Sequence, residues 1–235
     1  MQVQIYTVNI ETLIKSYDPD NFLNLVSPQK QKIIKSTPFK AVAWRHLIGE
    51  ILTKYIFTQK LGLISNELAL ITNEHGKPKL KNFPDIHFNL SHSGIWVAIT
   101  IHDHPVGIDV EHIRPLSSAS KIAKRFFSPL EQNYLNNIAQ DQYLGSFFKL
   151  WTLKESYIKA IGKGLSYSLS SFNIDITDQE TVKLIDPKNN KAWNFQSFDL
   201  KHSYSLAVCS TSTVKNKKII EIQPNTLLDF YYAPP

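Results

Sequence analysis

The chain has 235 residues, of which 43% are hydrophobic and 20% charged, a composition typical of a globular protein rather than a disordered one. No apolar run approaches the roughly 20 residues that a membrane-spanning helix needs, and the opening residues lack the basic and apolar regions of a secretory signal. Because Cys209 is the single cysteine, an intrachain disulfide and a cysteine-based zinc site are excluded. We therefore expect a cytoplasmic protein that does not associate with membranes.

The formal net charge of +6 is unevenly placed along the chain. Residues 27–60 carry seven basic residues and one acidic residue, Glu50, so the net charge of this segment equals that of the whole chain. The basic residues are Lys30, Lys32, Lys35, Lys40, Arg45, Lys54 and Lys60. Such a stretch is either the solvated face of a helix or a surface for a polyanion. A nucleic acid, an acidic protein surface and a phosphorylated small molecule all remain open at this point.

The N-terminal residues predict strands and helices in alternation. The expected elements are an opening strand over 1–10, a helix that starts at Ser27 and Pro28, a helix over 39–63 that ends at Gly62, a polar turn over 73–80, and strands over 86–94 and 95–101. A turn over 102–105 follows these strands and is the expected domain boundary.

The C-terminal residues repeat this mixture of strands and helices. The expected elements are a strand over 105–113, a helix with Pro129 at its first position and a capping box of Ser128 and Glu131, a long apolar helix over 141–164 that ends at Gly162 and Gly164, and strands over 172–176, 194–200 and 204–210. The sequence shows no internal repeat and no low-complexity linker.

The stretch "PVGIDVEHI" places two carboxylates on one face of a strand. Side chains alternate along a strand, so Ile108 and Val110 share one face while Asp109 and Glu111 share the other. At about 6 Å and an effective dielectric constant near 20, two such charges repel by about 3 kcal/mol. Either solvent screens this pair or a cation lies between its members.

The long helix carries a second charged pair, Glu155 and Lys159, which are four residues apart and share a face. An exposed helical ion pair is one interpretation. The apolar neighbours Trp151, Tyr157 and Ile158 favour another, in which the pair borders a cleft. Together with the two acids of the strand, Glu155 would complete an all-oxygen set of ligands that suits Mg²⁺ or Mn²⁺ better than zinc.

The segment "NLSHSG" contains Ser91 and His92. A nucleophilic role is poorly supported, because the chain has no G-x-S-x-G elbow. The pair is either a polar turn at a strand end or a contact for a phosphate oxygen. The P-loop and dinucleotide-binding patterns are also absent, and "GKP" over 76–78 alone indicates only a turn.

Five blocks occur in a characteristic order, namely "GKP" at 76, "FNLSHSG" at 88, "VGIDVE" at 106, "FFSPLE" at 126 and "LWTLKESYIKAIGKGLS" at 150. This set resembles the Sfp-type 4'-phosphopantetheinyl transferases across residues 27–175. The resemblance implies transfer of the phosphopantetheine arm of coenzyme A to a serine of an apo acyl, peptidyl or aryl carrier protein, with release of 3',5'-ADP. Such carriers serve fatty acid, polyketide or nonribosomal peptide synthesis.

The resemblance also implies an α+β fold. Two similar αβ subdomains, residues 1–103 and residues 104–235, would be related by a pseudo-twofold axis with the active-site cleft between them. The second subdomain would include the tail "QPNTLLDFYYAPP", for which the family offers no counterpart. We expect a monomer that does not bind nucleic acid.

The resemblance assigns roles by position in these blocks. The implied metal ligands are Asp109, Glu111 and Glu155; the implied catalytic residues are Glu155 and Lys159; and the implied coenzyme A contacts are Lys30, Lys32, Arg45, Lys77, Pro78, Ser91, His92 and Lys159. Glu155, or a metal-bound water beside it, is the implied base. Which lysine reaches the 3'-phosphate stays open, as do the roles of His46 and Glu131.

Two rival functions also fit parts of the pattern. A metal-dependent nuclease needs clustered acids, a lysine and a basic surface, but the common acid-x-lysine motif would want a lysine where Ile113 stands. A basic scaffold that binds nucleic acid or acidic proteins would explain the charge. It would not explain why an apolar helix carries Glu155 and Lys159.

Overall fold

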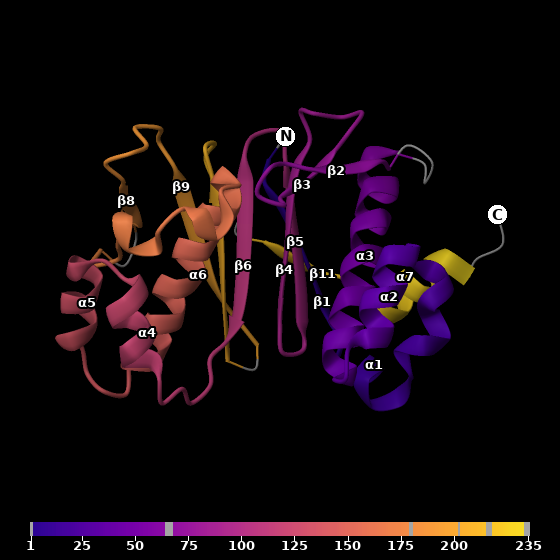
Figure 1. Cartoon of the computed structure of the whole chain (residues 1–235), viewed down its shortest axis with the longest axis horizontal. Coiled ribbons are helices and arrows are strands. Elements are labelled where there is room, and N and C mark those ends of the chain that lie inside the picture. Colours follow the sequence, from indigo (N-terminus) through magenta and orange to yellow (C-terminus); the bar gives the residue numbers. More distant parts are fainter. Residues whose placement is uncertain (1, 64–67, 179–180, 202, 215–217, 233–235) are drawn as a thin grey trace.

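The chain folds into alternating strands and helices (Figure 1), and the computed structural model describes residues 2–63, 68–178, 181–201, 203–214 and 218–232. The first elements are β1 (Gln4–Asn9), α1 (Glu11–Ser16), η1 (Pro19–Leu25), α2 (Pro28–Ser36), α3 (Lys40–Leu61), β2 (Leu70–Thr72), β3 (Pro78–Leu80), β4 (His87–Ser93) and β5 (Trp96–His102). The later elements are β6 (Val106–His112), α4 (Ala119–Phe126), α5 (Pro129–Asn136), α6 (Tyr143–Ile161), η3 (Gly164–Ser166), η4 (Leu169–Ser171), β7 (Asn173–Asp175), β8 (Lys183–Ile185), β9 (Asn194–Leu200), β10 (Tyr204–Ser210), β11 (Ile219–Glu221) and α7 (Pro224–Tyr232). The expected α+β class is confirmed.

The same order of elements occurs twice. A strand, helices that end in a long one, a two-stranded hairpin and two further strands follow one another from β1 to β5 and again from β6 to β10. The sheet orders also correspond, since β1-β5-β4 matches β6-β10-β9 and the neighbouring strands are antiparallel in both. Two similar αβ halves are what a pseudo-twofold arrangement requires.

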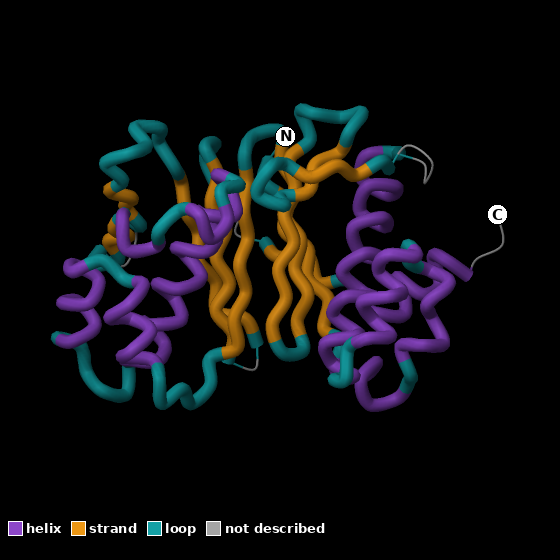
Figure 2. Tube along the Cα trace, viewed as in Figure 1, coloured by secondary structure: helices purple, strands orange, loops and turns teal. Residues whose placement is uncertain are grey.

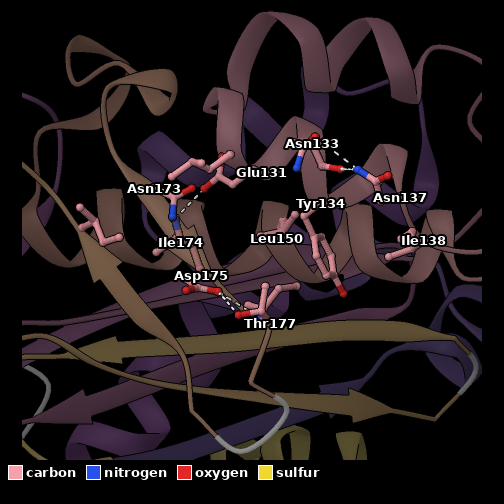
Figure 3. Close-up of a pocket in the computed structure, with 13 residues that line it drawn as sticks. Glu131, Asn133, Tyr134, Asn137, Ile138, Leu150, Asn173, Ile174, Asp175 and Thr177 are labelled. Atoms are coloured by element: carbon pink, nitrogen blue, oxygen red, sulfur yellow. Dashed lines mark hydrogen bonds between the residues drawn. The ribbon is translucent and has the colours of Figure 1, made fainter.

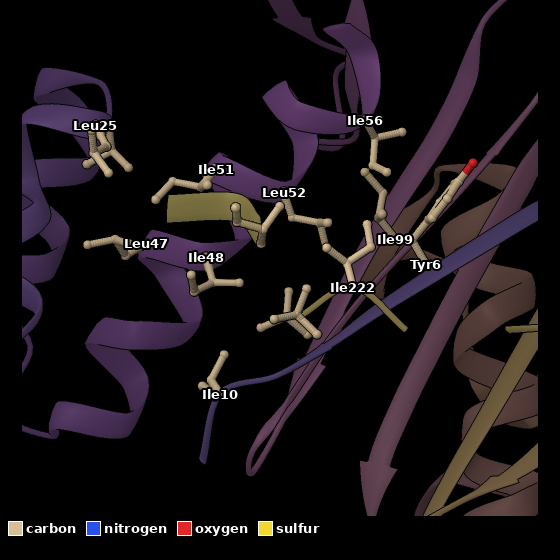
Figure 4. Close-up of a cluster of buried hydrophobic side chains, with 14 of the residues drawn as sticks. Tyr6, Ile10, Leu25, Leu47, Ile48, Ile51, Leu52, Ile56, Ile99 and Ile222 are labelled. Atoms are coloured by element: carbon tan, nitrogen blue, oxygen red, sulfur yellow. The ribbon is translucent and has the colours of Figure 1, made fainter. Parts of the chain in front are cut away.

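The two sheets lie between the two groups of helices (Figure 2). One hydrophobic cluster joins α3 to its sheet and contains Leu47, Ile51 and Ile99 (Figure 4). A second cluster joins α6 to the other sheet, and a third lies between the sheets, where side chains from β1 and β5 meet those of β6 and β10. Ile108 and Val110 belong to this third cluster, so their face of β6 is turned toward the core.

The tail packs differently from the expectation, which placed it with the second half. Strand β11 pairs in parallel with β1, and Ile222, Leu227 and Leu228 are buried in the cluster around α3. This packing gives β1 a partner on its outer side and covers apolar surface that α3 leaves open. The division of the chain between residues 103 and 104 stays a prediction.

Local signals in the sequence are confirmed at several helix ends. Ser27 caps α2, the capping box of Ser128 and Glu131 begins α5, and Gly62 and Gly162 end α3 and α6 with positive φ angles of 66° and 70°. Glycine is favoured there because a left-handed conformation costs it little. Within the described residues, no helix combines the length and the hydrophobicity that a membrane span requires.

Candidate active site

Strand β6 passes unusually close to helix α6. A Cβ atom added at Gly107 would lie 2.1 Å from the carbonyl oxygen of Ser156 and 2.4 Å from the backbone nitrogen of Ala160. Only glycine fits this approach. The side chains that follow on the same face of β6, Asp109 and Glu111, are therefore brought to the helix face that carries the second charged pair.

The acids of β6 and the charged pair of α6 line one cavity of about 380 Å³. Its lining residues are Leu90, Ser91, His92, Asp109, Glu111, Trp151, Glu155 and Lys159. A larger cavity, of about 570 Å³, lies elsewhere, between α5, α6 and β7 (Figure 3). Its wall has no basic side chain, and its Glu131 is already paired internally, so the smaller cavity is the candidate site.

Asp109 is the most constrained acid of the cavity. Its carboxylate accepts from Lys159 Nζ at 2.6 Å and from Ser91 Oγ at 2.9 Å, both at Oδ1, and the residue is 4% exposed. Its other oxygen, Oδ2, is buried and accepts no hydrogen bond from the residues described. Lys159 Nζ also donates to Ser91 Oγ at 3.0 Å. The three side chains form a closed triangle with one carboxylate oxygen left over.

The surroundings of the other two acids, Glu155 and Glu111, disfavour their charged forms. Burial raises the pKa of Glu155 to about 7, and repulsion by Asp109 adds to this rise. Burial also raises the pKa of Glu111, again with repulsion by Asp109, although Glu111 Oε2 accepts from Ser93 Oγ at 2.7 Å. Within the described part of the chain, Glu155 accepts no hydrogen bond. The charge of Lys159 does not compensate all three acids.

This donor set suits a hard divalent cation. It is made of oxygen alone, and it includes the unpartnered Oδ2 of Asp109. The charge of Asp109 also raises the pKa values of Glu111 and Glu155. In the described ranges, however, no three histidine, cysteine, aspartate or glutamate side chains already converge closely enough to hold an ion. The three acids line the same cavity, but their oxygens do not converge on one position. Lys159 Nζ contacts Asp109, so a bound cation would compete with the lysine for this carboxylate.

Some of the expected coenzyme A contacts lie next to this cavity. The rings of His46 and His92 are 5.6 Å apart, and Lys30 and Arg45 both act on the pKa of His46. Arg45 Nη1 donates to the carbonyl oxygen of Gly94 at 2.9 Å, and its Nε is buried without a partner among the described residues. Burial lowers the pKa of His92 to about 4, so this imidazole is neutral at pH 7. Helices α2 and α3 thus supply a basic border.

Other expected contacts lie elsewhere or are already engaged. Lys77 and Pro78 line a separate cavity of about 150 Å³, and Lys77 Nζ donates to the carbonyl oxygens of Val106 and Ala160, each at 3.0 Å. Lys32 is exposed on α2. The Ser91 hydroxyl donates to Asp109 and accepts from the amide of Val110 at 3.3 Å and from Lys159, which uses its full hydrogen-bonding capacity.

Glu131, whose role was open, belongs to a buried structural network. Its Oε1 accepts from Lys154 Nζ at 2.6 Å and from the amide of Ile174 at 2.7 Å, and its Oε2 accepts from the amide of Ser128 at 2.7 Å. Neither charged side chain of the pair is exposed. Lys154 was not predicted from the sequence, although a lysine inside the apolar stripe of a helix is itself a signal that a buried partner exists.

The fold and the cavity define an α+β protein with three acids and a lysine between two similar halves, and family models identify its class. The model described as "4'-phosphopantetheinyl transferase superfamily" matches residues 105–209, and "4'-phosphopantetheinyl transferase, N-terminal" matches residues 17–104. The chain belongs to the 4'-phosphopantetheinyl transferase family and is a phosphopantetheinyl transferase. The nuclease and scaffold interpretations are therefore set aside.

Individual relatives agree over most of their length. The chain is 33% identical to 4'-phosphopantetheinyl transferase Sfp of Bacillus subtilis, over 88% of this chain and 92% of that protein. It is 39% identical to 4'-phosphopantetheinyl transferase gsp of Aneurinibacillus migulanus, over 90% and 88%. A crystal structure of a holo-(acyl-carrier-protein) synthase from Bacillus anthracis aligns at a TM-score of 0.40, with 18% identity, over 45% of this chain and 92% of that one.

Proposed function

We propose that this enzyme transfers the 4'-phosphopantetheine arm of coenzyme A to a serine hydroxyl of an apo carrier protein, with release of 3',5'-ADP and with Mg²⁺ or Mn²⁺ as its cofactor. The observation that carries the proposal is the shared cavity, where Asp109, Glu111 and Glu155 from two elements face Lys159. Asp109 Oδ2 is a buried acceptor with no partner among the described residues.

Asp109, Glu111 and Glu155 would hold the metal, because they are the acids of the cavity and offer only oxygen. When bound, the divalent cation supplies positive charge that offsets the charge developing on the pyrophosphate during displacement. With Asp109 engaged as a ligand, Lys159 would no longer be held by its carboxylate. The ammonium group could then turn to the pyrophosphate.

Glu155 is the proposed base. A carrier serine is a poor nucleophile at neutral pH and must lose its proton during attack. Glu155 lines the cavity and accepts no hydrogen bond among the residues described, so its oxygens are available for that proton, directly or through water. Lys159 is the proposed electrostatic partner of the leaving 3',5'-ADP. No covalent intermediate on this chain is required.

The basic border is proposed to bind the nucleotide end of coenzyme A. Lys30, Arg45 and His92 lie at or beside the cavity. As a neutral imidazole, His92 can donate one N–H to a phosphate oxygen. Lys32 and Pro78 remain proposed contacts of coenzyme A. Ser91 would contact a phosphate of coenzyme A only after exchanging one of its present hydrogen-bond partners.

The direct test incubates the purified enzyme with coenzyme A, Mg²⁺ and a panel of apo acyl, peptidyl and aryl carriers. Intact-mass spectrometry should show a gain of one phosphopantetheine group, and the carrier whose serine is replaced by alanine should show none. A chelator should abolish the gain, and Mg²⁺ or Mn²⁺ should restore it. An unmodified panel in the presence of metal would contradict the proposed reaction, and transfer that survives the chelator would contradict the metal.

We also propose that the enzyme acts as a monomer in the cytoplasm. All the residues proposed for the site come from one chain, and its single cysteine, Cys209, is buried and reduced. Light scattering at working concentration should give the mass of one chain. A stable dimer would contradict the first part, and recovery of the protein outside the cytoplasmic fraction would contradict the second.

A further inference from the structure

Strands β4 and β6 are neighbours at facing sheet edges but do not form a backbone ladder with each other (Figure 1). Side chains of β4 take the place of that ladder. Asn89 Oδ1 accepts from the amide of Ile108 at 2.9 Å, Ser91 Oγ accepts from that of Val110 at 3.3 Å, and Ser93 Oγ accepts from that of His112 at 3.2 Å. The spacing of two on both strands gives a regular series of bridges.

The bridges satisfy amides that would otherwise be unpaired at the edge of a sheet. A buried amide without an acceptor is costly, and a full backbone ladder would draw the two strands to about 4.8 Å from each other. Bridging through side chains satisfies the same amides across a wider separation. Residues of the two strands can then line one cavity, as Ser91 and Asp109 do.

Each serine bridge does more than satisfy an amide. Ser91 Oγ donates to Asp109, and Ser93 Oγ donates to Glu111 at 2.7 Å. In both cases the hydroxyl accepts from one residue of β6 and donates to the carboxylate of the preceding residue. The bridge therefore fixes both the backbone position of β6 and the direction of its acid.

The two acids differ in how much else holds them. Asp109 also contacts Lys159, whereas the Ser93 hydroxyl is the sole hydrogen-bond donor to the Glu111 side chain among the described residues. Arg114 and Lys159 act on Glu111 only through their charges. In the part of the chain that the structure describes, no other hydrogen bond fixes the direction of the Glu111 carboxylate.

We propose that Ser93 is a positioning residue that aims the Glu111 carboxylate into the cavity and thereby sets the metal affinity of the site. This inference rests on the proposed function of the same cavity. It assigns to Ser93 a part in metal binding that does not involve contact with metal or substrate. Partners that orient a metal ligand typically contribute 10–100-fold in affinity or activity.

The test compares Ser93→Ala, which removes the hydroxyl, with Ser93→Thr, which keeps it. Ser166→Ala, at an exposed hydroxyl bonded to a backbone carbonyl, is the matched control. Mn²⁺ binding to the protein without coenzyme A is measured by electron paramagnetic resonance, and thermal unfolding checks the fold. We expect Ser93→Ala to weaken Mn²⁺ binding about tenfold. Ser93→Thr should stay within about threefold of the unmodified protein, and the control should not change.

A second measurement separates positioning from general loosening. With Mg²⁺ varied, Ser93→Ala should raise the concentration needed for half-maximal turnover while kcat recovers at saturation. When Glu111→Gln is already present, Ser93→Ala should add little further loss, because both changes act on one ligand. Fully additive losses, unchanged Mn²⁺ affinity in folded Ser93→Ala, or no Mn²⁺ binding by the unmodified protein would each overturn the inference.

Failure of the proposed function would look different. If no carrier is modified but Mn²⁺ still binds and Ser93→Ala still weakens it about tenfold, the inference about Ser93 holds and the transfer reaction is wrong. If carriers are modified and Mn²⁺ binding ignores Ser93, the reaction stands and the inference fails.

Discussion

The single ammonium group of Lys159 has two competing partners, the Asp109 carboxylate and the pyrophosphate of the proposed reaction. In the structure it is bound to Asp109 Oδ1 at 2.6 Å, yet the proposed reaction asks it to serve the pyrophosphate. A lysine on Asp109 and a metal on Asp109 exclude each other in part. The resting ion pair would therefore lower the apparent affinity for the proposed metal, and removing the lysine should make the acid more available.

Lys159→Met tests this competition. We expect kcat to fall at least a hundredfold while Mn²⁺ affinity stays equal or becomes tighter, because the methionine keeps the apolar stem but no longer competes for Asp109. Steady-state kinetics and Mn²⁺ titration give the two quantities. Weaker Mn²⁺ binding, or turnover like that of the unmodified enzyme, would show that the lysine has another role.

The basic border predicts a specific loss with Lys30→Ala and with Arg45→Ala. Each should weaken coenzyme A binding about tenfold more than binding of dephospho-coenzyme A, which lacks the 3'-phosphate, since a charge-assisted hydrogen bond contributes about 1.5–3 kcal/mol. Calorimetric titration of both ligands measures the ratio. Equal losses of affinity for the two ligands would mean that these residues do not contact the 3'-phosphate and form only a solvated helix face.

At the scale of elements, the turn between β2 and β3 is attached to the end of helix α6. Lys77 Nζ donates to the carbonyl oxygens of Val106 and Ala160, and Asn73 Nδ2 donates to that of Gly162 at 2.8 Å. Burial lowers the pKa of Lys77 to about 8. The turn therefore belongs to the first half of the chain, but it caps helix α6 of the second half, which carries Glu155 and Lys159.

Lys77→Met should therefore behave unlike the two changes in the basic border. We expect a lower melting temperature and a loss of turnover that is the same with coenzyme A and with dephospho-coenzyme A, because the affected carbonyls belong to the protein. The two co-substrates are compared at saturation. A loss confined to coenzyme A would instead assign Lys77 to the 3'-phosphate.

Helices α5 and α6 and strand β7 are held by the Glu131–Lys154 pair. Lys154→Met should lower the free energy of unfolding by about 3–5 kcal/mol, since it leaves a buried carboxylate without its cation. Urea unfolding gives the value, with Lys149→Met on the same helix as the control. A loss below about 1 kcal/mol would mean that Glu131 becomes protonated or rearranges at little cost.

Elements defined by adjacent residues were predictable from the sequence. The capping box at Ser128 and the glycine that ends α6 act within one helical turn, and the alternation in β6 correctly placed Asp109 and Glu111 on one face. Contacts between distant segments were not. Neither the acceptors of Lys77 nor the hydrogen bond from Ser93 to Glu111 leaves a local pattern.

At the scale of the whole molecule, one apolar core joins the two sheets and another includes the tail. The tail was misassigned because its strand β11 pairs with β1, and a parallel pair between the first and last strands has no signature in neighbouring residues. Leu227 of the tail is fully buried against the first half. Its contribution is therefore to stability and not to the chemistry of the cavity.

Leu227→Ala separates these two contributions. The free energy of unfolding should fall by about 2–5 kcal/mol, because the change leaves a cavity in a closed core. At a temperature where the variant is folded, kcat should match that of the unmodified enzyme. A selective loss of kcat in folded protein would show that the tail communicates with the site.

The pairing of β11 with β1 also bears on the order in which the enzyme matures on the ribosome. The first half is synthesised first, but its sheet lacks an outer strand and its core lacks Ile222 and Leu227 until the residues that follow β10 have emerged. The second half, from β6 to β10, has all its strands earlier. A nascent chain stalled before Ile219 would hold every residue of the cavity and still expose unfinished apolar surface, the kind of species that chaperones bind.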